Sequence, residues 1–126
     1  MIQFKFQVTN QYVDWHEDKN HSDLEFEGVF EIIIDNEVFF FDEYFLVFEF
    51  LNSALKWMEL DGESEMHYHC IDTNDNPLIS FLPVPSHLWT INSPWQKFQC
   101  QTLFTKEELY HAIERLRQST NLLHGV

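Results

Sequence analysis

Glycine, cysteine and basic residues are scarce in this chain of 126 residues. With three glycines it has no glycine-rich phosphate loop, which argues against the usual kinds of nucleotide chemistry. The two cysteines, Cys70 and Cys100, are too few for a disulfide framework, and in a reducing compartment we expect two buried thiols. No apolar run approaches the roughly 18 residues of a membrane-spanning helix, and residues 1–5 do not begin like a signal peptide. The sequence therefore predicts a cytoplasmic protein.

Acidic residues are the feature in which the chain departs most from an ordinary domain. Twenty-one Asp and Glu face seven Lys and Arg, a formal net charge of −14. Between Asn20 and Leu55 there are nine acids and no lysine or arginine. Such a surface repels phosphate backbones and anionic lipid, which disfavours nucleic-acid and membrane binding, and it attracts a basic protein partner. The alternative is that the charge only keeps a small domain soluble.

The stretch from Leu24 to Gly62 contains most of the phenylalanines, and we expect the core to form around it. Apolar residues at even positions of 24–34 alternate with acids at odd positions, which predicts a half-buried strand with a ladder of carboxylates outside. Gly28 in this strand indicates a bulge or a close backbone approach. Residues 35–37 (DNE) then predict a hairpin turn into a second strand at 38–41.

Two helices are expected. After residue 41 the apolar period changes to about 3.6, which predicts one long amphipathic helix with Asp42 as N-cap and Gly62 as its left-handed C-terminal residue. Near the end of the chain, Thr105 and Glu108 predict a capping box at the start of a second helix, which Asn121 can terminate.

The rest of the chain predicts antiparallel strands. The alternation in residues 2–8 gives a first strand, and if it pairs with 24–34, Lys5 faces the carboxylate ladder. Residues 10–23 are expected to form a long loop. Further strands with short connections are predicted at 65–72, 78–84, 87–91 and 98–104. The predicted fold is a single α+β domain over residues 1–126, a mostly antiparallel sheet of about six to seven strands with one long central helix packed on it and a C-terminal helix.

A histidine pair is the only pattern that suggests metal chemistry. His67 and His69 fall on one face of a predicted strand, and two imidazoles so placed can ligate zinc or another transition ion if His87 or Cys100 completes the site. With Gly62, the pair distantly resembles the first motif of cupins, although the glycine spacing is one residue short. A small metal- or ligand-binding enzyme is therefore one alternative function. No catalytic residue and no cofactor is predicted beyond it.

Two further segments carry a resemblance to a family. The order of elements, the segment DTNDNPLISF (72–81) and the turn SPWQ (93–96) resemble a family of small, acidic, uncharacterised bacterial proteins. These are similar in size and charge to the immunity proteins that accompany polymorphic toxins. The resemblance spans most of the chain and implies an inhibitor that occupies a basic toxin, often a nuclease, by presenting carboxylates where phosphates would bind.

We therefore expect a non-enzymatic binding protein, of the immunity or antitoxin type, whose acidic face engages a basic protein partner. Trp15 would anchor the contact, because aromatic residues are enriched at interfaces, unless it folds back onto the core. A further alternative is a structural or oligomerising module that pairs through an uncovered sheet face or edge. The residues predicted for partner binding are Asp14, Trp15, Glu17, Asp18, Asp23, Glu25, Glu27, Glu31, Asp35 and Glu37.

Overall fold

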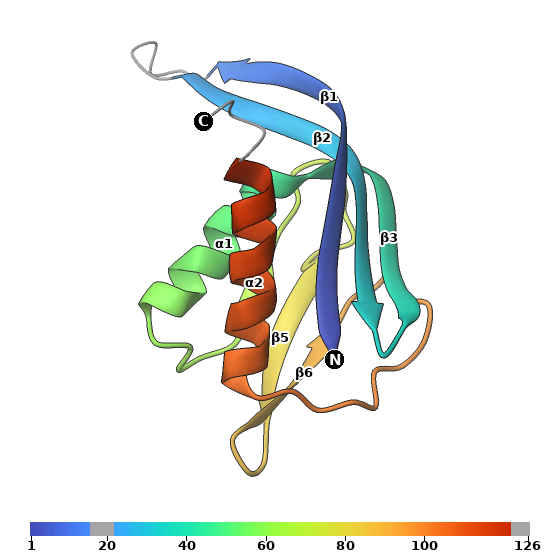
Figure 1. Ribbon diagram of the computed structural model, residues 1–126, viewed down its shortest axis with the longest axis vertical. Coiled ribbons are helices and arrows are strands. Elements are labelled where there is room, and N and C mark those ends of the chain that lie inside the picture. Colours follow the sequence, from blue (N-terminus) through green and yellow to red (C-terminus); the bar gives the residue numbers. More distant parts are fainter. Residues whose placement is uncertain (16–21, 122–126) are drawn as a thin grey trace.

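Two antiparallel three-stranded sheets and two helices make up the fold (Figure 1). The computed structural model describes residues 1–15 and 22–121, with side chains for 1–9 and 26–120. The α+β class is as predicted, but two sheets take the place of the single expected sheet. The elements are β1 (Ile2–Trp15), β2 (Ser22–Ile34), β3 (Glu37–Leu46), α1 (Val47–Glu59), β4 (Met66–Tyr68), β5 (Ile79–Val84), β6 (Leu88–Asn92) and α2 (Lys106–Asn121).

The first sheet has the order β1-β2-β3 and contains the predicted hairpin. Asp35 and Asn36 have φ of 50° and 70°, the left-handed conformation that two-residue hairpin turns require. The register places Lys5 opposite Glu31, as predicted for a first strand paired with the acidic one. Because β1 continues to Trp15 and β2 begins at Ser22, the predicted loop over 10–23 is wrong for its described part.

Gly28 is a point of close backbone approach, as predicted. A Cβ built on it would lie 2.1 Å from the carbonyl oxygen of Gln7 and 2.9 Å from Cα of Val8. The strand register shifts on both sides of this point, between Val8 and Asn10 in β1 and between Gly28 and Phe30 where β2 meets β3. Glycine is needed here because no side chain fits between the two backbones.

Helix α1 begins later than predicted. Asp42 is not its N-cap, because residues 42–46 continue β3, with Leu46 opposite Glu27 and Phe45 opposite Gly28. Pairing with β2 and burial of Phe45 and Leu46 stabilise the strand over the helix in this segment. The C-terminal end agrees better with the sequence. Gly62 has a φ of 56°, and its amide donates to the carbonyl of Trp57 at 3.0 Å.

The second sheet has the order β4-β5-β6 and is smaller than the sequence suggests. The strand predicted over 65–72 is reduced to β4, although its side chains alternate between buried and exposed as expected. Residues 98–104 do not form a strand. Only Phe104 bridges to β6, where it exchanges two backbone hydrogen bonds of 2.8 and 2.9 Å with Trp89.

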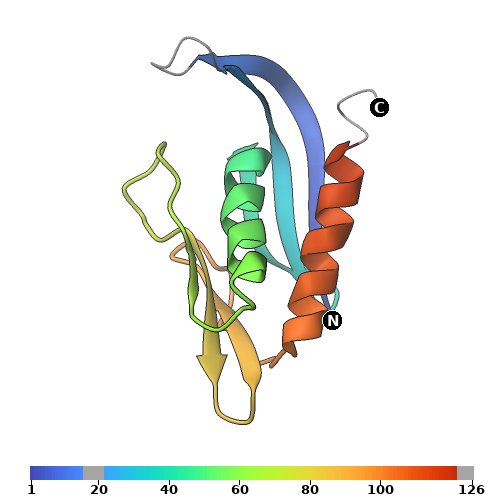
Figure 2. The same ribbon diagram turned by 90° about the vertical axis from the view of Figure 1, so that its left-hand side faces the viewer.

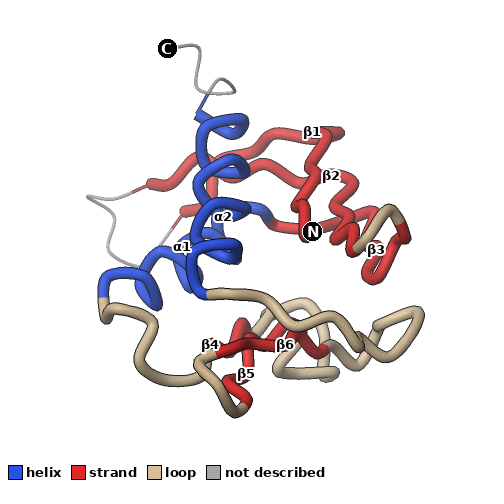
Figure 3. Tube along the Cα trace, turned by 60° about the horizontal axis from the view of Figure 1, so that its bottom comes forward, coloured by secondary structure: helices blue, strands red, loops and turns tan. Residues whose placement is uncertain are grey.

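Helix α1 lies between the two sheets, and α2 lies beside β1 (Figure 2). Loop segments gather around the smaller sheet (Figure 3), and the loop after β6 reaches β3, where the amide of Lys97 donates to the carbonyl of Phe39 at 2.8 Å. Aromatic rings join these layers: Phe50 of α1 packs against Phe30 of the first sheet with centroids 5.6 Å apart, and Trp57 of α1 meets Phe81 and Trp89 of the second sheet edge-on. Each such buried ring contributes about 1.5–3 kcal/mol.

The predicted capping box opens α2. The amide of Glu108 donates to Thr105 Oγ1 at 3.1 Å, and the amide of Thr105 donates to Glu108 Oε1 at 3.2 Å. Among the described residues neither helix has the length and apolar character needed to cross a bilayer.

Candidate binding surfaces

Apart from Glu17 and Asp18, the predicted partner-binding residues fall on β1, on β2 and at the turn between β2 and β3. Glu27 and Glu31 are half-buried on β2, whereas Asp35 and Glu37 are exposed at the turn. The backbone register sets Asp14 opposite Asp23. The side chains of Asp14, Trp15, Asp23 and Glu25 lie outside the described part, as do the whole residues Glu17 and Asp18.

Asp35 is engaged by groups of the protein itself. Its carboxylate accepts hydrogen bonds from the Met1 ammonium group at 2.6 Å and from the Thr102 hydroxyl at 2.5 Å. These two bonds hold the pKa of Asp35 below its usual value. With Lys5 opposite Glu31 as well, two of the described acids in the predicted face already have a cationic neighbour.

A second group of acids lies elsewhere, where β3 meets the loop after β4. Burial raises the pKa of Asp42, and the negative charges of Asp72 and Glu43 raise it further. A carboxylate is destabilised in this way when like charges approach it without a compensating cation. Tertiary structure therefore collects acids that are far apart in the sequence.

Two aromatic side chains accompany these acids. Tyr44 is 68% exposed. Trp95 stacks on Phe40 with centroids 6.1 Å apart, and its indole N–H donates to Asp75 Oδ2 at 2.9 Å. We call the set the acidic–aromatic patch; it consists of Asp42, Glu43, Tyr44, Asp72, Asp75 and Trp95.

The histidine pair is exposed on β4 and at its end. His67 shares a hydrogen bond of 2.8 Å with the Ser80 hydroxyl and one of 3.0 Å with Glu65 Oε1. His69 lies on the same exposed face, as predicted. Within the described residues, however, no group of three or more His, Cys, Asp or Glu side chains is placed to hold a metal ion.

Both cysteines are free thiols, but of the two buried thiols that the sequence predicts only Cys70 is buried. Cys70 is buried, and this burial raises the pKa of its thiol, so the group stays protonated at neutral pH. Cys100 is half-buried and donates to the carbonyl of Thr102 at 3.3 Å.

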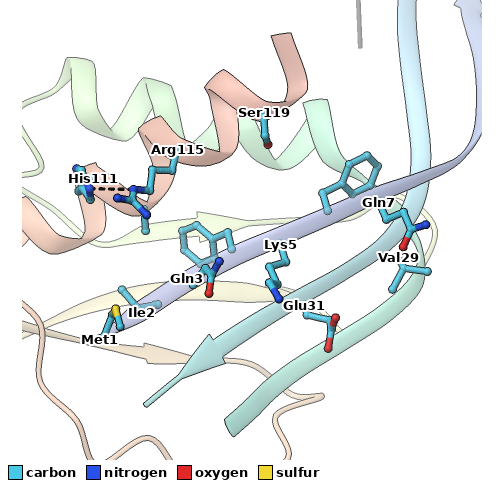
Figure 4. Close-up of a pocket in the computed structure, with 13 residues that line it drawn as sticks. Met1, Ile2, Gln3, Lys5, Gln7, Val29, Glu31, His111, Arg115 and Ser119 are labelled. Carbon is cyan, nitrogen blue, oxygen red and sulfur yellow. Dashed lines mark hydrogen bonds between the residues drawn. The ribbon is translucent and has the colours of Figure 1, made fainter. Parts of the chain in front are cut away.

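A groove of about 800 Å³ runs between β1 and α2 (Figure 4). Met1 and residues 2–7 of β1 line it, and β2 contributes Val29 and Glu31. The helix lines it with His111, Ala112, Arg115 and Ser119. Two of the seven Lys and Arg side chains of this acidic chain, Lys5 and Arg115, are thus in one groove.

His111 orients the guanidinium group of Arg115. Arg115 Nε donates to His111 Nε2 at 3.0 Å, so the neutral imidazole carries its proton on Nδ1. Among the described side chains, none accepts a hydrogen bond from the two terminal Nη groups of Arg115. In the groove, Arg115 is therefore an oriented cation whose terminal Nη groups can donate hydrogen bonds to a ligand.

Comparison with known proteins gives a family. The family described as "Domain of unknown function (DUF7878)" matches residues 2–122. The chain belongs to this family. Neither the curated proteins nor the solved structures contain a significant match. Nothing in these comparisons connects this DUF7878 domain with immunity proteins, so that resemblance stays a prediction.

The groove of this DUF7878 domain was not found from the sequence. One signal was present: His111, Arg115 and Ser119 are spaced by four residues and so share one helix face. That spacing could not show what the face is next to, because the packing of α2 beside β1 depends on contacts between the two ends of the chain.

Proposed function

We propose that this DUF7878 domain is a non-enzymatic protein-binding module that docks a basic partner on the acidic–aromatic patch. The observation that carries the proposal is that the negative charge of Asp72, in the turn after β4, acts on Asp42 of β3, in a region that also has the exposed side chain of Tyr44. Inhibition of a basic toxin is one role such a module could perform.

The electrostatics favour a cationic partner. Burial is the main cause of the raised pKa of Asp42, and the negative charges of Asp72 and Glu43 add to it. A bound Lys or Arg would relieve the repulsion between these carboxylates. The charge of the whole chain, −14, would also steer a basic protein toward it at low ionic strength.

The aromatic side chains of Tyr44 and Trp95 would contribute apolar contact area in addition to the charge. Tyrosine and tryptophan are enriched at interfaces because they bury a large apolar area and keep a polar group for hydrogen bonding. Tyr44 is mostly exposed in the unbound protein, and Trp95 is 37% exposed. A partner that covers both would bury apolar surface next to its ion pairs.

The test compares two variants of equal net charge. Glu43→Lys/Asp72→Lys reverses two exposed acids in the patch, and Glu59→Lys/Glu63→Lys reverses two exposed acids outside it. A partner captured from the native cell and then purified should associate with the patch variant at least tenfold more slowly than with the control variant. For the wild type, the association rate should fall as salt is raised.

Equal loss in both variants would show that only net charge matters, and unchanged binding of the patch variant would remove the patch from the interface. An association rate that does not depend on ionic strength would overturn the electrostatic mechanism.

A further inference from the structure

We propose that the groove between β1 and α2 binds an extended peptide, which adds to β1 as a fourth strand and places one carboxylate on Arg115. The proposal does not rest on the proposed function, because the groove and the acidic–aromatic patch involve different residues. The occupant is defined by its chemistry: an extended segment of a partner protein with an acidic side chain on the side that faces α2.

The outer edge of β1 has backbone groups available for pairing. In the described part of the chain, β2 is the only strand that pairs with β1. The amide of Asp35 donates to the carbonyl of Met1 at 2.9 Å, which fixes the alternation of the ladder. Residues 3, 5 and 7 then bond to β2, and the amides and carbonyls of Ile2, Phe4 and Phe6 point outward.

The helix provides a wall of matching length. His111 and Ser119 are eight residues apart, or about 12 Å along a helix. Ile2 and Phe6 are four residues apart, or about 13 Å along a strand. Figure 4 shows His111, Arg115 and Ser119 following β1 in the same order as the strand residues, so Arg115 lies near the middle of the row. A strand of about five residues would span this distance.

Charge selects the peptide. The register places Lys5 opposite Glu31, so Lys5 already has an acidic neighbour on β2. Arg115 has no described carboxylate partner, and its planar guanidinium is suited to bidentate pairing with one. Ile2 and Phe4 also line the groove, but they belong to the core, so only a small apolar area of each is exposed there.

A second copy of the chain is a poorer occupant. Two chains that each carry a net charge of −14 repel one another. Residues 2–9 of a second β1 also contain no Asp or Glu that could pair with Arg115. A peptide contributes one acidic group without that long-range penalty.

The test uses an immobilised library of capped seven-residue peptides. Threonine occupies the even positions, and every residue type is allowed at the odd positions, so each peptide favours an extended conformation. Wild-type protein should enrich peptides with Asp or Glu at one central odd position. Arg115→Gln should bind the selected peptides at least tenfold more weakly, and Arg117→Gln, which removes a positive charge from the same helix outside the groove, should bind them like wild type.

N-methylation of the selected peptide tests pairing with the strand. Methyl groups on one alternate set of amides should abolish binding, and methyl groups on the other set should leave it within about twofold, because only one set faces β1. Circular dichroism melting of each variant checks that the fold is retained.

Several outcomes would overturn the proposal: no peptide bound at millimolar concentration, the same acidic preference in Arg115→Gln, or equal effects of the two methylation patterns. Dimerisation of the free protein through β1 in analytical ultracentrifugation would assign the edge to a second copy instead. The patch variant Glu43→Lys/Asp72→Lys should bind the peptides normally, so failure of one proposal is distinguishable from failure of the other.

Discussion

Substitution of Gly28 by alanine should destabilise the protein strongly, although it adds only one methyl group. The new Cβ would lie 2.1 Å from the Gln7 carbonyl oxygen and 2.9 Å from the Gln7 carbonyl carbon. Both are backbone atoms, so no side-chain rotation relieves the overlap, and β1 must move away from β2.

We expect a loss of about 3 kcal/mol in the free energy of unfolding, at the upper end of the usual cost of overpacking. For a domain whose total stability is about 5–15 kcal/mol, this is a large fraction. With a urea m value of about 2 kcal/mol/M, the unfolding midpoint should fall by roughly 1.5 M. The four tryptophans provide a fluorescence signal for the titration.

The matched control is Val29→Ala at the next position. Val29 is half-buried, so removing its methyl groups should cost about 1 kcal/mol. Gly28→Ala should therefore be the more harmful of the two changes. If the free energy of unfolding of Gly28→Ala instead stays within about 0.5 kcal/mol of wild type, the close approach of β1 and β2 is not as described.

Two smaller changes should have measurable effects on stability. A carboxyl whose pKa is raised on folding stabilises the protein below its unfolded value of about 3.9, and this contribution is lost as pH rises through the folded pKa. Asp42→Asn should therefore have a higher free energy of unfolding than wild type at neutral pH. Urea titrations at several pH values should show that this difference in free energy vanishes below about pH 4. A difference that stays constant with pH would contradict burial and repulsion as the cause. Thr105→Ala should lower the free energy of unfolding by about 1 kcal/mol, measured by thermal unfolding, because α2 loses its capping hydroxyl. Thr105→Ser keeps a hydroxyl and should retain most of this stability. An alanine variant as stable as wild type would show that the capping box does not stabilise the protein.

Local signals in the sequence were reliable where short-range physics decides the outcome. The turn at Asp35 and Asn36, the glycine at position 28 and the capping box at Thr105 each involve backbone geometry or hydrogen bonds that a few residues determine. The segment 42–46 shows the opposite case. Its apolar spacing fits a helix, yet pairing with β2 makes it a strand, because long-range hydrogen bonding and burial outweigh a weak local preference.

The candidate surfaces divide in the same way. Sequence composition established the acidic character of the chain and predicted the absence of a disulfide between Cys70 and Cys100, which are free thiols in the structure. It could not pair Asp42 with Asp72 or reveal that Asp35 is held by Met1 and Thr102, because these contacts join residues distant in the chain.

Charge, periodicity and turn chemistry are properties of neighbouring residues, so the sequence by itself determined an acidic α+β protein with a β2–β3 hairpin and a capped C-terminal helix. The division into two sheets, the place of α1 between them and the groove beside the outer edge of β1 were decided only by tertiary structure. Each of these depends on which apolar faces pack together across the chain, and local patterns do not encode that choice.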